Sequence, residues 1–289
     1  MHFFMLAIGV GVAWWVRSRW SPTVGTWSER WQQSLGQFLF APLLLLMTAI
    51  AIGCMGPFGQ MVGHGEGWLS YGLAIGFIVW AIASLIKLAN EGFQTLKHIQ
   101  THPKIEIADH SAYLLPITDL YSARVGFWQP ELVVSQGLLD QLDAAHLNAV
   151  LFHEQAHLEY RDTFWFFWLG WIRRLTFWLP HTEALWQELL ILRELRADQF
   201  ATQQVDPLVL AESLLAVVSA PLMQPEVCAA FGWSSLDAEE SGDAGGRLME
   251  RINSILEDTN SRSLQICWWS FSWLVLVFLP IAMIPFHMK

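Results

Sequence analysis

Long apolar stretches separated by polar segments are the first pattern along this chain. Three lie near its start and one near its end, at 1–16, 37–55, 69–89 and 265–286. A helix needs about 20 apolar residues to cross the hydrocarbon layer of a bilayer. The last three stretches approach that length, and the first is shorter. The pattern predicts four transmembrane helices: three within a membrane region at 1–89, and a C-terminal membrane helix within 263–289.

A polar region at 90–262 separates the third apolar stretch from the fourth, and its pattern is that of a mixed α and β domain. Short β-prone runs, broken by Asp, Pro and Gly, occur at 105–107, 112–117 and 132–135. An amphipathic helical stripe then follows Asp143, which can cap the start of a helix. A second amphipathic pattern covers 247–256. The expected fold class is therefore an α-helical membrane protein that carries one α+β domain.

The composition agrees with a membrane protein. Hydrophobic residues make up 54% of the chain, which contains 17 Trp and 18 Phe, and only 15% of the residues are charged. A soluble domain normally has more charge and fewer aromatic side chains. The net charge of −10 leaves no basic patch, so direct binding of nucleic acid is not expected. We expect a multi-pass protein of the cell membrane, with the lipid bilayer as its surroundings.

Basic residues near the apolar stretches predict how the chain is oriented. Those near the first three stretches are Arg17, Arg19, Arg30, Lys87, Lys97 and Lys104. The first three precede the second stretch and the last three follow the core of the third, whereas the loop at 56–68 contains neither Lys nor Arg. Loops rich in Lys and Arg stay in the cytosol. We therefore expect 56–68 outside the cell and the domain at 90–262 in the cytosol.

The stretch VLFHEQAHLEYRD, at 150–162, carries the main chemical signal. It places His153, Glu154 and His157 in an H-E-x-x-H arrangement on a predicted helix. Histidines four residues apart project from one face of an α-helix, so one metal ion can bind both. A zinc ion with protein ligands and one open position lowers the pKa of its bound water to about 7. Glu154 would take a proton from that water, so the motif predicts a catalytic zinc site.

A second motif, RELRADQFA at 193–201, supplies the remaining ligand. Glu194 and Asp198 stand four residues apart there, on what is expected to be another helix. Glu194 would complete a His, His, Glu ligand set, and Asp198 would accept the free ring N–H of a ligating histidine. Structural zinc sites usually have four protein ligands. Three ligands beside a glutamate base therefore favour a catalytic site.

The two motifs together resemble the H-E-x-x-H and E-x-x-A-D-x-x-A pair of gluzincin metallopeptidases of membranes. The segment ARVGFWQPELVVSQGLLDQLDAAHLNAVLFHEQAHLEYRD, at 123–162, is similar to the membrane peptidase domain of the BlaR/MecR β-lactam sensor family. The similarity covers about 113–201. It implies a mini-gluzincin zinc peptidase domain, in which the sheet edge beside the metal binds the substrate as an added strand.

The resemblance also implies substrate contacts. Val125, Gly126 and Phe127 are the residues expected at that sheet edge, with an ordinary interior strand as the alternative. Arg251, in the second amphipathic pattern, is a further candidate contact, with a solvated helix face as the alternative.

The expected function is that of a membrane-bound zinc metalloendopeptidase that hydrolyses peptide bonds of a cytosolic protein. The resemblance makes a transcriptional repressor in a signalling pathway the expected substrate. A quality-control protease for membrane proteins, and a non-catalytic membrane receptor with a metal-binding domain, are the alternatives. BlaR-type sensors carry a penicillin-binding domain after their last span, whereas no S-x-x-K motif follows 265–286 here. Any signal is therefore expected to act through the spans, the loops or a separate sensor partner.

The apolar segment at 163–180 has the length of a span, but we expect it to be interfacial or re-entrant. It contains Arg173 and Arg174, and a charge inside hydrocarbon is costly. A single crossing would also put Glu194 and His153 on opposite sides of the membrane, where one zinc ion could not bind both. A buried core helix is the alternative.

Overall fold

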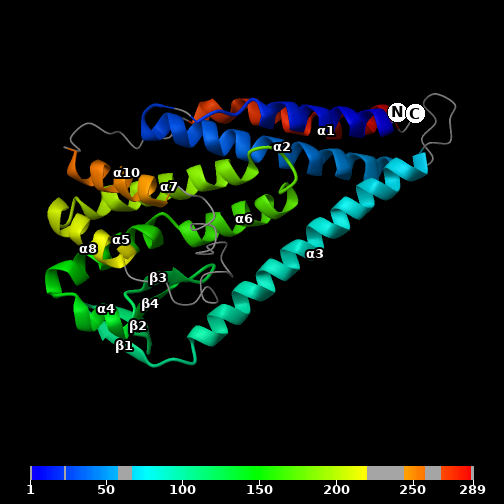
Figure 1. Ribbon diagram of the computed structural model, residues 1–289. Helices are drawn as coiled ribbons and strands as arrows, with labels where there is room; N and C mark the ends of the chain where they lie inside the picture. Colours follow the sequence, from blue (N-terminus) through cyan, green and yellow to red (C-terminus); the bar gives the residue numbers. More distant parts are fainter. Residues whose placement is uncertain (1, 23, 58–66, 220–243, 258–267, 288–289) are drawn as a thin grey trace. The chain divides into compact units, whose positions relative to one another are not determined.

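The computed structural model describes residues 2–22, 24–57, 67–219, 244–257 and 268–287 (Figure 1). Within these residues the chain is mostly helical and contains one small mixed sheet. It divides into two compact units. The helical unit consists of 1–86, 171–190 and 263–289, and the sheet unit consists of 87–170 and 191–262.

The helical unit contains two helices long and apolar enough to cross a membrane: α2, Trp27–Met55, and α3, Gly67–Ile99, whose later part belongs to the sheet unit. Helix α1, His2–Ser18, is shorter and packs along α2, with Ala13 and Ala41 in a shared buried cluster. These helices coincide with the three apolar stretches predicted in the N-terminal region.

Both long helices extend past the apolar stretches that predicted them. Helix α2 begins at Trp27 because Thr26 and Glu29 form a capping box, in which each side chain bonds to the other residue's backbone N–H. Helix α3 continues to Ile99, and its polar part carries a Lys87–Glu91 ion pair at 3.9 Å. The apolar pattern marks where a helix suits hydrocarbon, whereas the cap marks where the helix begins.

The C-terminal segment is helical but broken. It forms a 3-10 helix η2, Trp268–Phe278, followed by α11, Leu279–Ala282, and α12, Ile284–His287. Pro280 and Pro285 lack the backbone N–H that a continuous helix needs. The fourth span therefore stays a prediction, as does the crossing by α1. Residues 58–66 of the predicted outer loop and the start of the predicted fourth span lie outside the described residues.

The sheet unit is built on four strands in the order β1-β2-β4-β3. Their bounds are β1 Lys104–Ile107, β2 His110–Leu115, β3 Ser122–Val125 and β4 Glu131–Ser135. Strands β2 and β4 are parallel, and the other two pairings are antiparallel. The three predicted β-prone runs are confirmed as β1, β2 and β4. Strand β3 lies at one end of the sheet, beside β4.

Helix α5, Ala144–Glu159, covers one face of the sheet. Leu132 and Val134 of β4 share a buried cluster with Val150 and Leu151 of α5. On the opposite face, Val133 packs with residues that include Ile99 at the end of α3. The predicted cap is confirmed, because the Asp143 side chain accepts hydrogen bonds from the backbone N–H groups of Ala145 and His146.

The remaining helices of the chain complete the surroundings of α5. Their bounds are α4 Gln136–Gln141, α6 Asp162–Leu175, α7 Thr182–Ala201, α8 Pro207–Ser219 and α10 Ala244–Leu256. Ala149 of α5, Ala201 of α7, Leu210 of α8 and Ile255 of α10 belong to one buried cluster. The amphipathic helix predicted at 247–256 is confirmed as part of α10. The segment at 163–180 contains one helix that ends at Leu175, followed by turns.

Candidate metal centre

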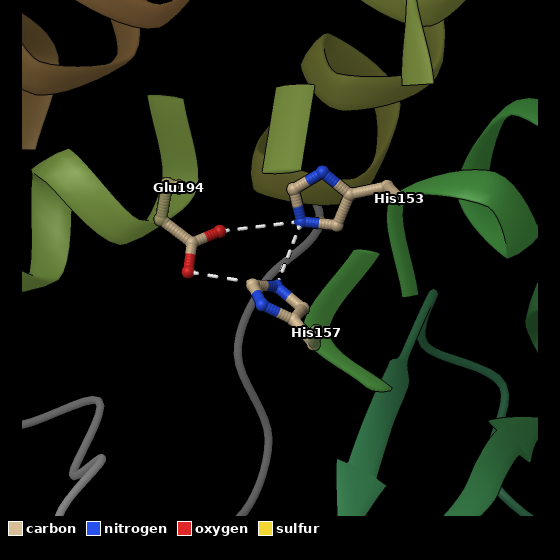
Figure 2. A group of neighbouring side chains, drawn as sticks. All are labelled: His153, His157 and Glu194. Atoms are coloured by element: carbon tan, nitrogen blue, oxygen red, sulfur yellow. Dashed lines mark hydrogen bonds and ion pairs between the residues drawn. The ribbon is translucent and has the colours of Figure 1, made fainter. Parts of the chain in front are cut away.

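Three side chains from two helices meet in the sheet unit. Successive turns of α5 present His153 and His157, and α7 presents Glu194 (Figure 2). His157 and Glu194 are 8% and 7% exposed, and His153 is only slightly more open. One ligand atom from each residue can be chosen so that all three lie within 4.8 Å of one another. The group could therefore hold a metal ion.

The distances within this group suit one shared ion. The Nε2 atoms of His153 and His157 are 3.2 Å apart. Glu194 Oε2 lies 3.3 Å from Nε2 of His153, and Glu194 Oε1 lies 3.8 Å from Nε2 of His157. Two atoms that each bind a tetrahedral zinc ion at about 2.1 Å are about 3.4 Å apart. The spacing of the two Nε2 atoms and that of Glu194 Oε2 from Nε2 of His153 are close to this value, whereas the 3.8 Å spacing from His157 involves the other oxygen of Glu194.

Each histidine is held by a carboxylate on its other ring nitrogen. Nδ1 of His153 lies 2.9 Å from Oδ1 of Asp198, and Nδ1 of His157 lies 2.8 Å from Oδ2 of Asp162. A proton on Nδ1 that is donated to a carboxylate leaves Nε2 as the lone-pair nitrogen. Both Nε2 atoms are therefore set up to bind a metal. Asp198 lies beside His153, as predicted, and the role of His153 as a metal ligand stays a prediction.

Asp162 is a site residue that the sequence reasoning missed. Helix α5 ends at Glu159, Tyr160 is its C-cap residue, and Arg161 follows with a positive φ of 54°. This left-handed turn brings the next residue, Asp162, back to His157. An aspartate directly after the motif helix was the available signal. Arg196, on α7, donates a hydrogen bond to Oδ1 of Asp162 and so fixes that carboxylate.

A second arginine fixes the carboxylate behind the other histidine. Arg251 of α10 donates from Nε and Nη2 to the two oxygens of Asp198, at 2.7 and 2.8 Å. Its Nη1 also lies 3.5 Å from Oε2 of Glu194. Arg251 was predicted as a substrate contact. In the structure its guanidinium is directed at Asp198 and Glu194, and its contact with a substrate stays a prediction.

Charged groups surround the three side chains of this candidate metal group. Burial by itself would raise the pKa of Glu194, but the neighbouring Arg193 and His157 hold that pKa well below its usual range. Arg193 also donates to Oε1 of Glu194 at 2.8 and 3.0 Å, which leaves Oε2 facing His153. Burial would lower the pKa of His153, whereas hydrogen bonds to Asp198 and Glu194 raise it to about 9. The centre therefore favours an added positive charge.

Glu154 lies on the same helix, between the two histidines in sequence. It is 5% exposed, and its Oε1 accepts a hydrogen bond from the Ser122 hydroxyl at 2.7 Å. Its Oε2 is buried and has no hydrogen-bond partner within the described residues. A buried carboxylate oxygen without a donor is costly unless another molecule supplies one. Glu154 is therefore anchored at one oxygen and available at the other.

Ser122 is the second residue that the sequence reasoning missed. It is the first residue of β3, and its hydroxyl reaches Glu154 across the packing of the sheet against α5. A single serine at the start of a strand does not by itself indicate a functional residue in the sequence. Only the pairing of β3 with β4, which sets Ser122 opposite Val134, brings it to this place.

The predicted sheet-edge residues are only partly at the edge. Strand β3 ends at Val125, whose side chain is buried in the cluster on the face away from α5. Gly126 has a φ of +134°, a conformation that suits glycine, and turns the chain out of the strand. Phe127 packs its ring against Phe164 and Phe167 of α6. The edge strand lies at 122–125 and contains Val125 alone of the three residues, and their role in binding a substrate stays a prediction.

The sequence was also compared with models of known protein families and with curated proteins, and neither comparison found a match. The centre's own residues therefore indicate its chemistry. Two histidines and a glutamate could hold one ion, and a second glutamate lies on the same helix as the histidines.

Proposed function

We propose that the chain is an integral-membrane zinc metalloendopeptidase of the gluzincin type, similar to the peptidase domain of the BlaR/MecR family. One observation carries the proposal. Glu154 sits in the helix that presents His153 and His157, with one oxygen held by Ser122 and the other buried without a partner in the described part of the chain. A site that only stores a metal has no need of such a carboxylate.

The donor set favours zinc. Two imidazole nitrogens and one carboxylate suit zinc, whereas Mg²⁺ and Ca²⁺ are usually bound by oxygen ligands alone. The two Nε2 atoms of His153 and His157, and Oε2 of Glu194 with Nε2 of His153, have spacings close to those of tetrahedral zinc ligands. A zinc ion held there would supply the positive charge that activates water and polarises the carbonyl group of a peptide bond.

The chain's own residues would move the proton. Glu154 Oε2 would accept a proton from water and deliver it to the amine that leaves the cleaved peptide bond. The Ser122 hydroxyl, 2.7 Å from Oε1, would hold the carboxylate in place during both transfers. Asp198 and Asp162 would keep the two imidazoles aligned.

The edge strand would bind the substrate. Strand β3 has β4 on one side and, in the part of the chain that the structure describes, no strand on the other. An extended peptide can add to such an edge through backbone hydrogen bonds. Because Ser122 of β3 bonds Glu154, a peptide along this strand would pass the catalytic carboxylate. Substrates would therefore be cut within extended segments.

Membrane attachment completes the proposal. Helices α2 and α3 have the length and composition of spans, and we propose that α1 and the C-terminal segment provide two more. By the loop charges the peptidase domain would face the cytosol. A cytosolic transcriptional repressor that offers one extended segment is the proposed substrate, and an external or membrane signal would reach the site through the spans or a sensor partner.

Metal content and cleavage test the catalytic proposal together. The zinc-loaded full chain in detergent is incubated with a peptide mixture, and products are identified by mass spectrometry. Wild type should cut peptides, and Glu154→Gln should keep about one zinc per chain and cut none. Glu159→Gln, which changes an exposed glutamate at the end of the same helix, is the matched control and should cut normally. Equal cleavage by Glu154→Gln would exclude Glu154 as the base.

The ligand assignment has its own test. His153→Ala, His157→Ala and Glu194→Ala should each lose zinc, measured by metal analysis of the purified protein. Zinc retained at full occupancy by Glu194→Ala would remove that residue from the ligand set.

The substrate proposal is tested in cells. Proteomes of cells with wild type and with Glu154→Gln are compared for peptides that stop appearing. A single cut in one soluble repressor is expected. Broad degradation of unfolded membrane proteins, with candidate repressors intact, would replace the signalling role with quality control.

A further inference from the structure

Arg124 lies in the middle of the edge strand, on the side of the sheet that faces the catalytic helix. Side chains two residues apart in a strand point to the same face. Ser122 and Arg124 are such a pair, and the Ser122 hydroxyl reaches Glu154 of α5. Their partners in β4, Val134 and Leu132, pack against α5 as well. Arg124 thus shares the face that carries the proposed catalytic base.

The guanidinium of Arg124 has no hydrogen-bond partner for two of its nitrogens. Nε and Nη2 are both buried, and no described residue accepts from them. Glu154 and Glu131 act on Arg124 through their charge, but neither forms an ion pair with it in the described part of the chain. Glu154 Oε1 accepts from Ser122, and Glu131 lies 3.7 Å from Lys104 Nζ. Glu131 is therefore paired elsewhere, and Glu154 is bonded through Oε1 alone, with no bond between its Oε2 and Arg124 in the described part of the chain.

A buried, charged guanidinium without acceptors is unfavourable. Burial lowers the pKa of Arg124, and Glu154 and Glu131 partly oppose that change, so the side chain stays charged at neutral pH. Arginine presents its N–H groups as a planar fork that matches a carboxylate. An arriving carboxylate would satisfy both free nitrogens and balance the charge.

The edge strand brings such a carboxylate within reach. A peptide added along β3 would place alternate side chains on the face of Ser122 and Arg124. The side chain opposite Arg124 would lie two residues from the one opposite Ser122, a distance of about 7 Å along the strand. The position opposite Ser122 is the one closest to Glu154, the proposed base, because Ser122 bonds Glu154.

We infer that Arg124 binds a carboxylate of the substrate, so that preferred substrates carry Asp or Glu about two residues from the cleaved bond. The inference rests on the proposed peptidase function and adds the feature by which the site selects its substrate. It also explains why a buried arginine stands here, although two of its nitrogens lack a hydrogen-bond acceptor in the described residues.

The test uses synthetic ten-residue peptides and the zinc-loaded full chain in detergent. One Glu is moved through every position, each peptide has a counterpart with Gln at that position, and both are made with a free or an amidated C-terminus. Cleavage by wild type is measured by mass spectrometry. Retention of the same peptides on immobilised Glu154→Gln protein is measured separately.

Wild type should cut peptides with Glu at one position about tenfold faster than their Gln counterparts, as expected for a buried charge-assisted pair. Arg124→Gln should abolish this ratio, Arg124→Lys should keep part of it, and Arg124→Glu should favour Lys instead of Glu there. Each ratio is taken within one preparation, so a lower folded fraction does not affect it. Arg19→Gln, which removes an exposed arginine of the helical unit, is the control and should leave the ratio unchanged.

The cleavage and retention measurements, with free and amidated peptides, separate the possible outcomes. A preference that follows the free C-terminus and still needs Arg124 would support carboxylate binding and assign the carboxylate to the chain end. Cleavage by wild type with equal rates for Glu and Gln peptides would overturn the inference and leave the peptidase function standing. Retention that depends on Arg124 without any cleavage would overturn the peptidase function and the cleavage preference, and would leave carboxylate binding by Arg124 standing. Absence of both retention and cleavage would overturn both proposals.

Discussion

Arg251 and Asp198 form a bidentate ion pair, in which Nε lies 2.7 Å from Oδ2 and Nη2 lies 2.8 Å from Oδ1. Asp198 lies in turn 2.9 Å from Nδ1 of His153. Burial would raise the pKa of Asp198, but Arg251 keeps that pKa below its usual range, so Asp198 stays charged. Helix α10 therefore helps to orient a proposed metal ligand on α5 without supplying a ligand itself.

Arg251→Ala should lower the affinity for zinc about 10- to 100-fold, the usual effect of losing a residue that orients a ligand. Without Arg251, Asp198 would be a buried carboxylate with one partner fewer, and His153 would be held less firmly. Competition with a chelator measures the affinity. Arg247→Ala on the same helix removes an equal charge and should change it little. Similar affinities for the two variants would contradict the orienting role.

Asp162→Ala should also weaken zinc binding, by about tenfold or more. Asp162 holds Nδ1 of His157 and accepts from Arg196, so the substitution would leave the imidazole free to turn and the arginine without its carboxylate. The same chelator competition measures the loss. Asp140→Ala, an exposed aspartate of α4, is the matched control. If both variants bind zinc as wild type does, Asp162 plays no part in the site.

The two histidines of the candidate metal group could be predicted from the sequence because their geometry is local, whereas Glu194 was predicted from a second motif on another helix. His153 and His157 share a helix face by spacing alone, and Asp143 marks where that helix begins. Ser122 and Asp162 could not be found in the same way. The position of Ser122 depends on strand pairing between β3 and β4, and that of Asp162 depends on a left-handed turn after the helix.

The two helices long and apolar enough to cross a membrane show the same difference between what the sequence predicts and what it does not. Apolar length predicted spans within α2 and α3 but does not mark where α2 begins. The predicted span starts at 37, whereas the helix starts at Trp27, after a capping box of polar residues. In the C-terminal segment the apolar composition predicted one helix, whereas Pro280 and Pro285 interrupt the backbone hydrogen bonds. The composition of a segment predicts whether it suits hydrocarbon or water, and single residues determine where its helix begins and where it is interrupted.

A pH-dependent contribution to stability is expected at His146. Its Nδ1 lies 2.7 Å from Asp143, and its Nε2 lies 3.2 Å from Glu212 of α8. The hydrogen bonds to these carboxylates raise the pKa of His146 above its usual value. A raised pKa means that the folded state holds the proton more tightly, so the stabilisation is complete below about pH 6.5 and is lost as pH rises through the higher folded pKa.

His146→Gln should therefore lower the thermal midpoint of the zinc-loaded protein at pH 6 by more than at pH 9. The difference should be small and should shrink in high salt, because the two carboxylates are exposed. Thermal unfolding of both proteins across this pH range measures it. A difference that grows towards pH 9 would have the wrong sign for this ion pair.

The last prediction concerns which side of the membrane the proposed peptidase domain occupies. Lys97 lies near the end of α3, after the part with the composition of a span, and Glu66 lies just before α3 begins. Because Lys and Arg flank the Lys97 side and are absent from 56–68, a cysteine at position 97 should react with a membrane-impermeant reagent only after the cell is opened. A cysteine at position 66 should react in intact cells. Both are introduced after replacing the native cysteines, including the exposed Cys54, by serine. The reverse labelling pattern would place the metal centre outside the cell, where a cytosolic repressor could not reach it.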